Sequence, residues 1–184
     1  MPFMLKKIFG GLLLLVTLSA IGGCVNQPTA VSKSNIAEGY TSASKSIYVM
    51  SLVGSTQPEF NTLLEKSLTR KLEWAGYQVK YANSNGLELD PDSHLAKAKE
   101  FGAQLVLVIT PSGGKVMGMS NFYVEGQYRI AAVDVTLKRV VYKSQLRFWP
   151  YNDPWVMGIQ WNDASAQGLA DAIYNEGHYK GLLF

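Results

Sequence analysis

From Ser46 onward the sequence switches between the residue spacing of a strand and that of a helix, and this limits the chain to folds with a β-α-β unit. Ser46–Val53 is rich in β-branched and aromatic residues, as is typical of a strand. A helix is expected from Thr56, which offers a capping hydroxyl, to Gly76, which is a suitable stop. Its apolar residues fall on one side at helical spacing: Phe60, Leu63, Leu64, Leu68, Leu72 and Ala75. Tyr77–Tyr81 then begins the next strand.

The following segment adds a helix and a central strand. A short helix is expected to start at Asp92 or Ser93 and to stop at Gly102. Gln104–Thr110 is continuously apolar, which predicts a strand covered on both faces. Pro111–Ser120, rich in glycine and methionine, is expected to be a mobile loop.

The region 122–149 has the pattern of long antiparallel strands. A turn at Lys138-Arg139 would place Asp134 opposite Lys143, an attractive cross-strand pair. Upstream of this turn the alternation of apolar and polar residues shifts by one position, so we expect a bulge or strand break near 129–132.

A last helix should begin at Asn162 or Asp163, with this apolar stripe: Ala166, Leu169, Ala170, Ile173 and Tyr174. The order β-α-β-α-β-β-β-α predicts a single two-layer α+β domain, in which about three helices pack on a mixed sheet.

The first 23 residues have the three parts of a secretory signal. Lys6 and Lys7 give a positive start, about a dozen apolar residues follow, and small residues precede Cys24. The apolar stretch is shorter than the ~20 residues that span a bilayer, so a signal peptide is favoured over a transmembrane anchor. We expect residues 1–23 to be a signal peptide, 24–45 to be a flexible tether and 46–184 to be the globular domain. The alternative for part of 24–45 is an edge strand.

Ala20-Ile21-Gly22-Gly23-Cys24 resembles the bacterial lipoprotein signal, in which an aliphatic and two small residues precede an invariant cysteine. The resemblance implies that Cys24 is the lipid attachment site, carries palmitate-type acyl chains and becomes the first residue. Two or three acyl chains would anchor the protein stably. Val25 stands where an aspartate would signal retention at the inner membrane. The resemblance therefore implies the periplasmic face of the outer membrane in a Gram-negative cell. The alternative is an ordinary secreted protein with an unrelated cysteine.

Charge and cysteine content exclude several classes of protein. The 184 residues contain 17 Lys and Arg, 14 Asp and Glu, and one Cys. Loss of Lys6 and Lys7 with the signal leaves 15 basic and 14 acidic residues, which is too balanced for a nucleic-acid partner. A single cysteine excludes an intramolecular disulfide framework and a cysteine-rich zinc site.

The sequence contains no recognisable catalytic or metal-binding constellation. Neither His94 nor His178 has another ligand at metal-binding spacing, and both are expected at the surface. Ser112–Lys115 superficially resembles a phosphate loop, but the flanking residues of that motif are missing. The alternating acids Glu88, Asp90 and Asp92 are better interpreted as a solvated turn than as a calcium site. We therefore expect no enzyme activity, no catalytic residues, no metal and no cofactor.

An aromatic segment near the C-terminus is the main candidate for partner binding. Its residues are Trp149, Tyr151, Trp155 and Trp161. Tryptophan and tyrosine dominate binding hot spots and stack on sugar rings. The competing interpretation is structural, with the rings covering the end of the sheet and packing beneath the last helix.

The mature domain resembles the periplasmic lipoprotein domains related to the TolB amino-terminal fold, a group that includes LpoB and CsgG. The resemblance is carried by the following segments: Ser46–Val53, Trp74–Tyr77, Gly102–Val108, Ala132–Val135 and Val140–Ser144. It implies an α+β fold, and fold likeness alone does not transfer function.

These observations favour a lipid-anchored, non-enzymatic binding or assembly module of the cell envelope, whose partner is a protein or peptidoglycan. The first alternative is a subunit of an oligomeric secretion complex of the CsgG type. Lys143, Gln145 and Arg147 on the presumed outer face of the hairpin argue against a lipid-facing surface there. A second alternative, an enzyme acting on peptidoglycan, requires a histidine and a carboxylate to meet in a cleft. The sequence leaves the oligomeric state open.

Overall fold

The computed structural model describes residues 28–84, 93–117, 123–151 and 161–183. In these ranges a six-stranded mixed sheet carries three α-helices, which confirms the predicted α+β class. The strands are β1 (Thr29–Ile36), β2 (Ser46–Ser51), β3 (Gln78–Asn83), β4 (Leu105–Met117), β5 (Tyr123–Asp134) and β6 (Arg139–Trp149). The helices are α2 (Pro58–Trp74), α3 (Ser93–Phe101) and α4 (Asp163–Tyr179), with a short 3₁₀ turn at Val53–Ser55.

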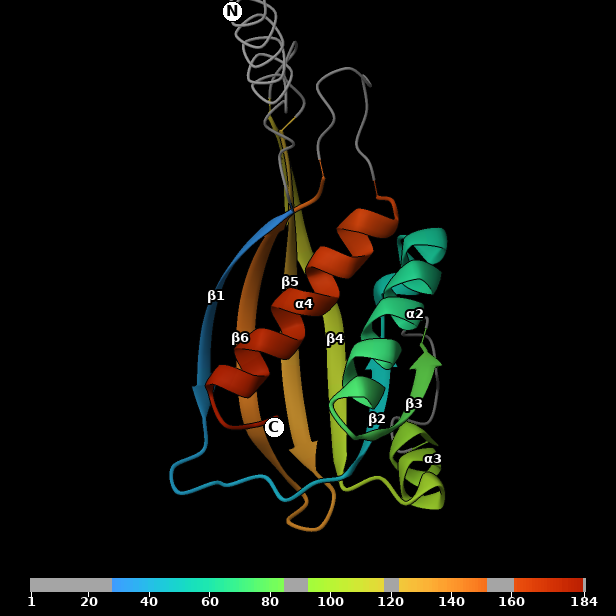
Figure 1. Ribbon diagram of the computed structural model, residues 1–184, viewed down its shortest axis with the longest axis vertical. Coiled ribbons are helices and arrows are strands. Elements are labelled where there is room, and N and C mark those ends of the chain that lie inside the picture. Colours follow the sequence, from blue (N-terminus) through green and yellow to red (C-terminus); the bar gives the residue numbers. More distant parts are fainter. Residues whose placement is uncertain (1–27, 85–92, 118–122, 152–160, 184) are drawn as a thin grey trace, which may run out of the picture.

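The strand order is β1-β6-β5-β4-β2-β3. Strands β2, β3 and β4 are parallel, with β2 in the middle, whereas β4, β5, β6 and β1 are linked by antiparallel pairs. The β2-α2-β3 passage is therefore the parallel β-α-β unit that the sequence predicts. The antiparallel strands extend the sheet away from this unit and end at β1 (Figure 1).

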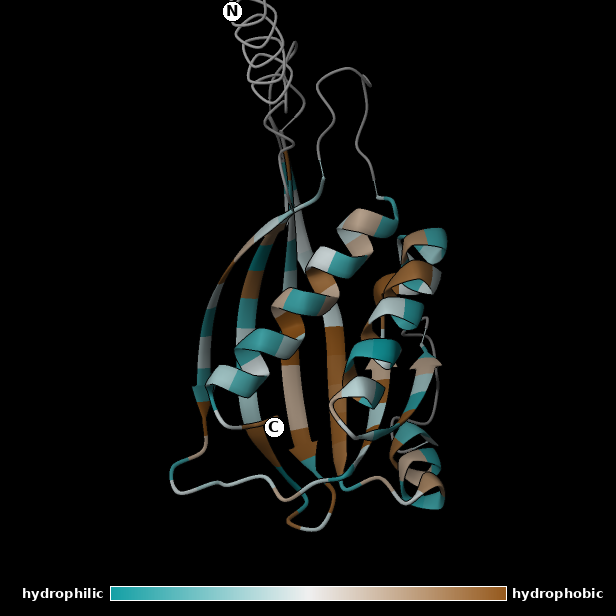
Figure 2. Ribbon diagram, viewed as in Figure 1, coloured by the Kyte–Doolittle hydropathy of each residue, from teal (hydrophilic) through white to brown (hydrophobic). Residues whose placement is uncertain are grey.

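Helices α2 and α4 lie side by side across one face of the sheet (Figure 1). Their apolar stripes meet the inward-facing side chains of the strands, and Figure 2 shows the hydrophobic stretch of β4 behind them. The fully buried residues include Leu64, Leu68 and Leu72 from α2, Leu169 from α4, and Leu105, Leu107 and Ile109 from β4. The sequence predicted both stripes because burial on one helix side repeats every three to four residues.

Helix α3 packs on the opposite face, at the parallel end of the sheet. Ala98 of α3 contacts a small cluster formed by Tyr48 of β2, Val106 of β4 and Ala103. Alternate residues of each strand point to opposite faces, so the side chains of Tyr48 and Val106 point away from the main core and pack against α3. Among the described helices, both faces of the sheet are therefore covered near β2, whereas only one face is covered from β5 to β1.

Thr29–Ile36 forms an edge strand that pairs antiparallel with β6, from Thr29 opposite Trp149 to Ile36 opposite Tyr142. The tether expected over 24–45 therefore gives way, for these residues, to the edge-strand alternative. The sequence indicates a strand here only weakly, because the residues of β1 that face the helix are small, with Ser32 and Ser34 among them.

The loop expected at Pro111–Ser120 is wrong for its first seven residues. Strand β4 continues to Met117 and stays paired with β5, with a register shift between Pro111 and Gly113. Proline has no N–H to give to a ladder, and a bulge is one of the places where a strand tolerates it. The bulge lets pairing resume beyond the proline.

The hairpin register also differs from the prediction. Asp134 pairs with Arg139 rather than with Lys143, because the connection is a four-residue turn in which Lys138 has a φ of 51°. A two-residue turn was assumed from the charged pair Lys138-Arg139. The predicted change of phase is present as a register shift between Ala132 and Val133.

The predicted capping residue of α2 is wrong, while that of α4 is confirmed. Helix α2 begins after Gln57, because the preceding 3₁₀ turn uses the Thr56 hydroxyl, which donates to the Val53 carbonyl at 3.3 Å. At α4 the Asn162 side chain accepts a hydrogen bond from the Ser165 backbone N–H at 3.0 Å. None of the helices in the described ranges has the length and apolar character needed to cross a membrane.

Candidate functional site

The lipid attachment expected at Cys24 lies outside the described residues, and the described chain begins at Pro28. Pro28 packs against Gly168 of α4, where an added Cβ would lie 2.5 Å from the Pro28 Cβ. Only glycine leaves room for this contact. The first described residues are therefore held between α4 and the end of β6, where Thr29 pairs with Trp149.

Trp161 has a structural position. Its ring meets the ring of Phe60 edge-on, with centroids 4.8 Å apart and an interplanar angle of 63°. It also leaves little room at Gly126, where an added Cβ would be 3.1 Å from the Trp161 ring. Trp161 therefore closes the top of the core between α2 and the sheet, as the structural interpretation of the aromatic segment expects.

Trp149 and Tyr151 lie at and just after the end of β6. Trp149 is half-buried at the end of β6, and the Arg147 guanidinium lies 5.6 Å from the centroid of its ring. The backbone N–H of Tyr151 donates to the Ser165 hydroxyl at 2.7 Å, which ties the chain after β6 to the first turn of α4. Trp155 lies outside the described residues.

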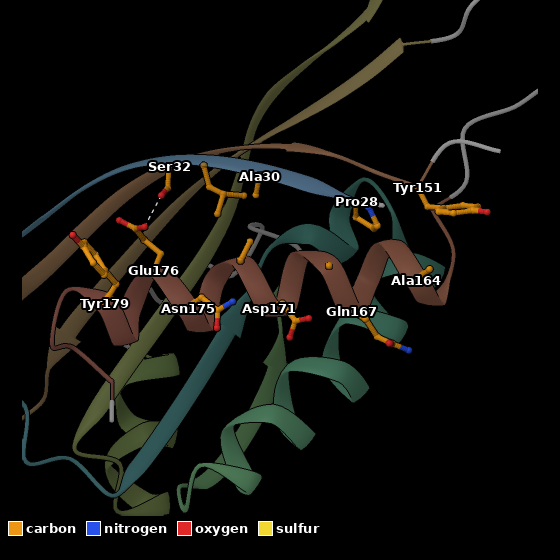
Figure 3. Close-up of a pocket in the computed structure, with 13 residues that line it drawn as sticks. Pro28, Ala30, Ser32, Tyr151, Ala164, Gln167, Asp171, Asn175, Glu176 and Tyr179 are labelled. Carbon is orange, nitrogen blue, oxygen red and sulfur yellow. Dashed lines mark hydrogen bonds between the residues drawn. The ribbon is translucent and has the colours of Figure 1, made fainter. Parts of the chain in front are cut away.

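A groove of about 830 Å³ runs between β1 and α4 (Figure 3). Residues from both elements line it, including Ala30, Ser32, Gln167, Asn175 and Tyr179. Glu176 projects from α4 toward β1 and accepts hydrogen bonds from the hydroxyls of Ser32, at 2.6 Å, and Ser34. The Glu176 carboxylate thus links the edge strand β1 to helix α4 through these two hydrogen bonds.

The same carboxylate influences the neighbouring strand. Burial raises the pKa of the Tyr142 hydroxyl, the nearby Ser144 lowers it, and the negative charge of Glu176 raises it again. The net effect is that the pKa of Tyr142 lies above the ordinary tyrosine value. The groove is a polar seam between α4 and β1, and of its two acids Glu176 accepts from serines and Asp171 forms an ion pair with Lys71.

The other face of β1, β6 and β5 carries a cationic cluster, which we define as Lys33, Arg129, Lys143 and Arg147. All four side chains are exposed and surround Gln145. Lys33 and Arg129 pair directly with Gln145 from the two neighbouring strands. Lys143 and Arg147 lie two residues before and after it on β6, on the same face. No helix of the described chain covers this face.

The two histidines occupy different environments. His94, expected at the surface, is buried instead, and its Nδ1 lies 3.3 Å from the Tyr48 hydroxyl. The short helix α3 turns it toward the sheet, which its polar sequence neighbours did not indicate. His178 is exposed and stacks on Tyr174, with centroids 5.8 Å apart. Within the described ranges no three His, Cys, Asp or Glu residues are close enough to hold a metal ion.

Trp74 is an exposed aromatic residue that did not figure among the candidates from the sequence. Trp74, at the end of α2, is 85% exposed and borders a groove shared with α4. Its neighbours there include Lys71, which forms an ion pair with Asp171. Its position at a helix end before Gly76 gave no signal that it would be turned outward.

Known structures resemble this chain at the level of the fold. The PelC dodecamer from Paraburkholderia phytofirmans matches with a TM-score of 0.55 and 13% identity, covering 84% of this chain and 98% of that one. A variant of the same dodecamer gives a TM-score of 0.51 at 14% identity, covering 77% and 96%. Lipoprotein GNA1162 from Neisseria meningitidis gives 0.44 at 18% identity, covering 73% and 98%. No protein-family model and no curated protein sequence matches the chain.

Proposed function

We propose that this protein is a lipid-anchored, non-enzymatic module of the bacterial cell envelope that binds an envelope partner through its exposed sheet face. The open, cationic face opposite the helix layer is the observation that carries the proposal. A surface of this kind is available for binding without any rearrangement of the core. Cys24 would hold the domain at the membrane, with the short segment up to Pro28 as the connection.

Two further points support an envelope role. The N-terminal sequence has the lipoprotein pattern, and the entry point at Pro28 lies only four residues after Cys24. Fully extended, four residues reach at most about 14 Å, so the domain would sit close to the lipid surface. The fold is similar to that of a PelC chain over 98% of that chain's length.

The lipid anchor is tested by metabolic labelling with a palmitate analogue in a bacterial host that processes lipoproteins. The wild-type chain is expected to be labelled and to fractionate with membranes. Cys24→Ser should abolish labelling and release the protein into the soluble periplasmic fraction. An unlabelled wild-type protein, or a labelled Cys24→Ser variant, would contradict this part of the proposal.

A second candidate function is that of a subunit in an oligomeric envelope complex. It is favoured by the likeness to PelC, which forms a dodecamer. Light scattering on the detergent-purified protein distinguishes the two. A single monomeric mass across micromolar concentrations would favour the binding module, and a defined ring-sized mass would favour the oligomeric subunit.

A further inference from the structure

The cationic cluster has almost no acidic counterpart on its own face. Among the described strand residues on this face, Glu125 is the one carboxylate, and it is buried and accepts a hydrogen bond from Gln127 at 2.8 Å. Lys115, on β4 opposite Glu125, adds a fifth exposed cation. One third of the 15 basic residues of the processed chain therefore lie on one face. Described acidic residues form no ion pair with any member of the cluster.

The spacing of the cluster is fixed by the sheet. Neighbouring strands lie ~4.8 Å apart, so Lys33 and Arg129, on either side of β6, have backbones about 10 Å apart. Lys143 and Arg147, four residues apart along β6, are separated by about 13 Å. The backbones of the four cations are therefore spread over about 10 by 13 Å of the sheet. This spread suits a ligand that repeats its negative charge.

The shape of the face supports an extended ligand. Two hollows, of about 640 and 340 Å³, lie on either side of the row formed by Lys33, Gln145 and Arg129. Lys143 lines the first hollow and Arg147 lines the second. A chain that lies along β6 would cross the row and place a charge in each hollow.

The uncharged side chains of the face indicate the chemistry of the ligand. Asn35, Thr110, Gln127 and Gln145 offer amide and hydroxyl groups that exchange hydrogen bonds with sugar hydroxyls. Protein interfaces usually have a core depleted of charged residues, whereas the centre of this face is its most charged part. Trp149 adds an aromatic ring at one end, beside Arg147, and rings of this type stack on sugars.

We propose that the open face of β1, β6 and β5 binds an extended polysaccharide that carries carboxylates on its sugar rings. Lys33, Arg129, Lys143 and Arg147 bind the carboxylates, and Gln145 bonds a hydroxyl between them. This proposal names the class of partner that the proposed envelope module binds. It rests on the proposed function, which places the protein in the cell envelope where such a ligand would be encountered. Binding is measured on purified protein, so its outcome is independent of the lipid-labelling experiment.

The test compares binding of polygalacturonate with binding of neutral dextran by the full-length protein in non-ionic detergent. Polygalacturonate should bind saturably, dextran should not, and 0.5 M NaCl should weaken binding at least tenfold because salt screens exposed charges. The double variant Arg129→Gln/Lys143→Gln should weaken binding at least tenfold. The single variant Lys33→Gln, at the edge strand, should show a smaller loss in the same direction.

The matched control is Lys66→Gln/Arg70→Gln, which removes the same charge from exposed positions of α2. It should bind polygalacturonate like the wild type. Equal losses in both double variants would overturn the site, since they would show a response to net charge alone. Absence of polygalacturonate binding by the wild type would overturn the proposal outright. Tighter binding of poly-glutamate, or of vesicles containing phosphatidylglycerol, would replace the polysaccharide with an acidic protein or a membrane surface.

Discussion

The two faces of β6 show how differently this sheet uses its sides. Leu146 and Phe148 point beneath α4 and are 1% and 0% exposed, whereas Gln145 and Arg147, one residue away, are exposed. The helix-covered side is closely packed and nearly without charge. The open side is charged, polar and free of covering helices in the described chain. The packing of β6 therefore depends on one side of the strand, which leaves its other side available for binding.

The parallel end of the sheet is the counterexample that limits this comparison. There α3 covers the second face, and Tyr48 and Val106 are buried on it. The open face thus exists only where β5, β6 and β1 extend the sheet beyond the β-α-β unit. These antiparallel strands extend the exposed face of the sheet without enlarging the small hydrophobic cluster beneath α3.

The largest effect is expected in the helix-covered core. Leu68→Ala, at a fully buried position of α2, should lower the free energy of unfolding by about 2–5 kcal/mol because it leaves a cavity. Leu137→Ala, at a residue that is 52% exposed in the β5–β6 turn, should change it by less than about 0.5 kcal/mol. Urea unfolding monitored by circular dichroism measures both. Similar losses at the two positions would show that the two regions do not differ as described.

High pH provides the next test. Burial holds the pKa of the Tyr128 hydroxyl above its usual range on the helix-covered side. The folded protein keeps this proton above pH 10, where the unfolded chain loses it. The contribution is therefore complete below pH 10 and declines above it, by about 1.4 kcal/mol per pH unit until the folded pKa is reached.

Urea unfolding between pH 8 and 11.5 should show a shallower decline in Tyr128→Phe than in the wild type. Tyr179→Phe, which alters a residue that is 81% exposed, should retain the wild-type slope. An unchanged slope in Tyr128→Phe would mean that this hydroxyl is accessible to water in the folded state.

The seam between α4 and β1 should give a smaller effect. Glu176→Gln keeps the shape of the side chain but removes the charge that strengthens its hydrogen bonds to Ser32 and Ser34. We expect a loss of about 1 kcal/mol, concentrated in faster amide hydrogen exchange of β1. Asn175→Ala, at an exposed neighbouring position of α4, serves as the control. Unchanged exchange in β1 would show that strand pairing alone holds the edge.

The smallest effect on stability is expected on the open face. Arg129→Gln/Lys143→Gln should change the free energy of unfolding by less than about 0.5 kcal/mol, because neither side chain has an ionic partner in the described chain. Thermal unfolding of the variant and the wild type provides the comparison. A loss of 2 kcal/mol or more would make the cluster part of the fold rather than a binding surface.

The sequence predicted the elements whose burial is one-sided and repeated. The stripes of α2 and α4, the strand at Ser46 and the cap at Asn162 belong to this class. Strand β1 was only the alternative to a flexible tether, because that strand faces α4 with serines whose role depends on Glu176, more than 140 residues away. The predicted hairpin register was wrong because the sequence did not distinguish a four-residue turn from a two-residue turn.

The candidate site was predicted only in part. Lys143, Gln145 and Arg147 were placed on the outer side of the hairpin from alternation alone, and they are exposed there. Lys33 and Arg129 join the cluster because their strands pair with β6. Residue spacing along the sequence does not reveal which strands pair. The aromatic segment divides between a structural Trp161 and a Trp149 beside Arg147, and its role in binding stays a prediction.

Chemical-shift mapping of the isotopically labelled protein during titration with short galacturonate oligomers tests the central claim most directly. We expect saturable shifts at the backbone amides around Gln145 on β6 and at the adjoining positions of β1 and β5, with α2 and α4 unaffected. Shifts confined to the helices, or to the groove around Glu176, would contradict the assignment of binding to the open face.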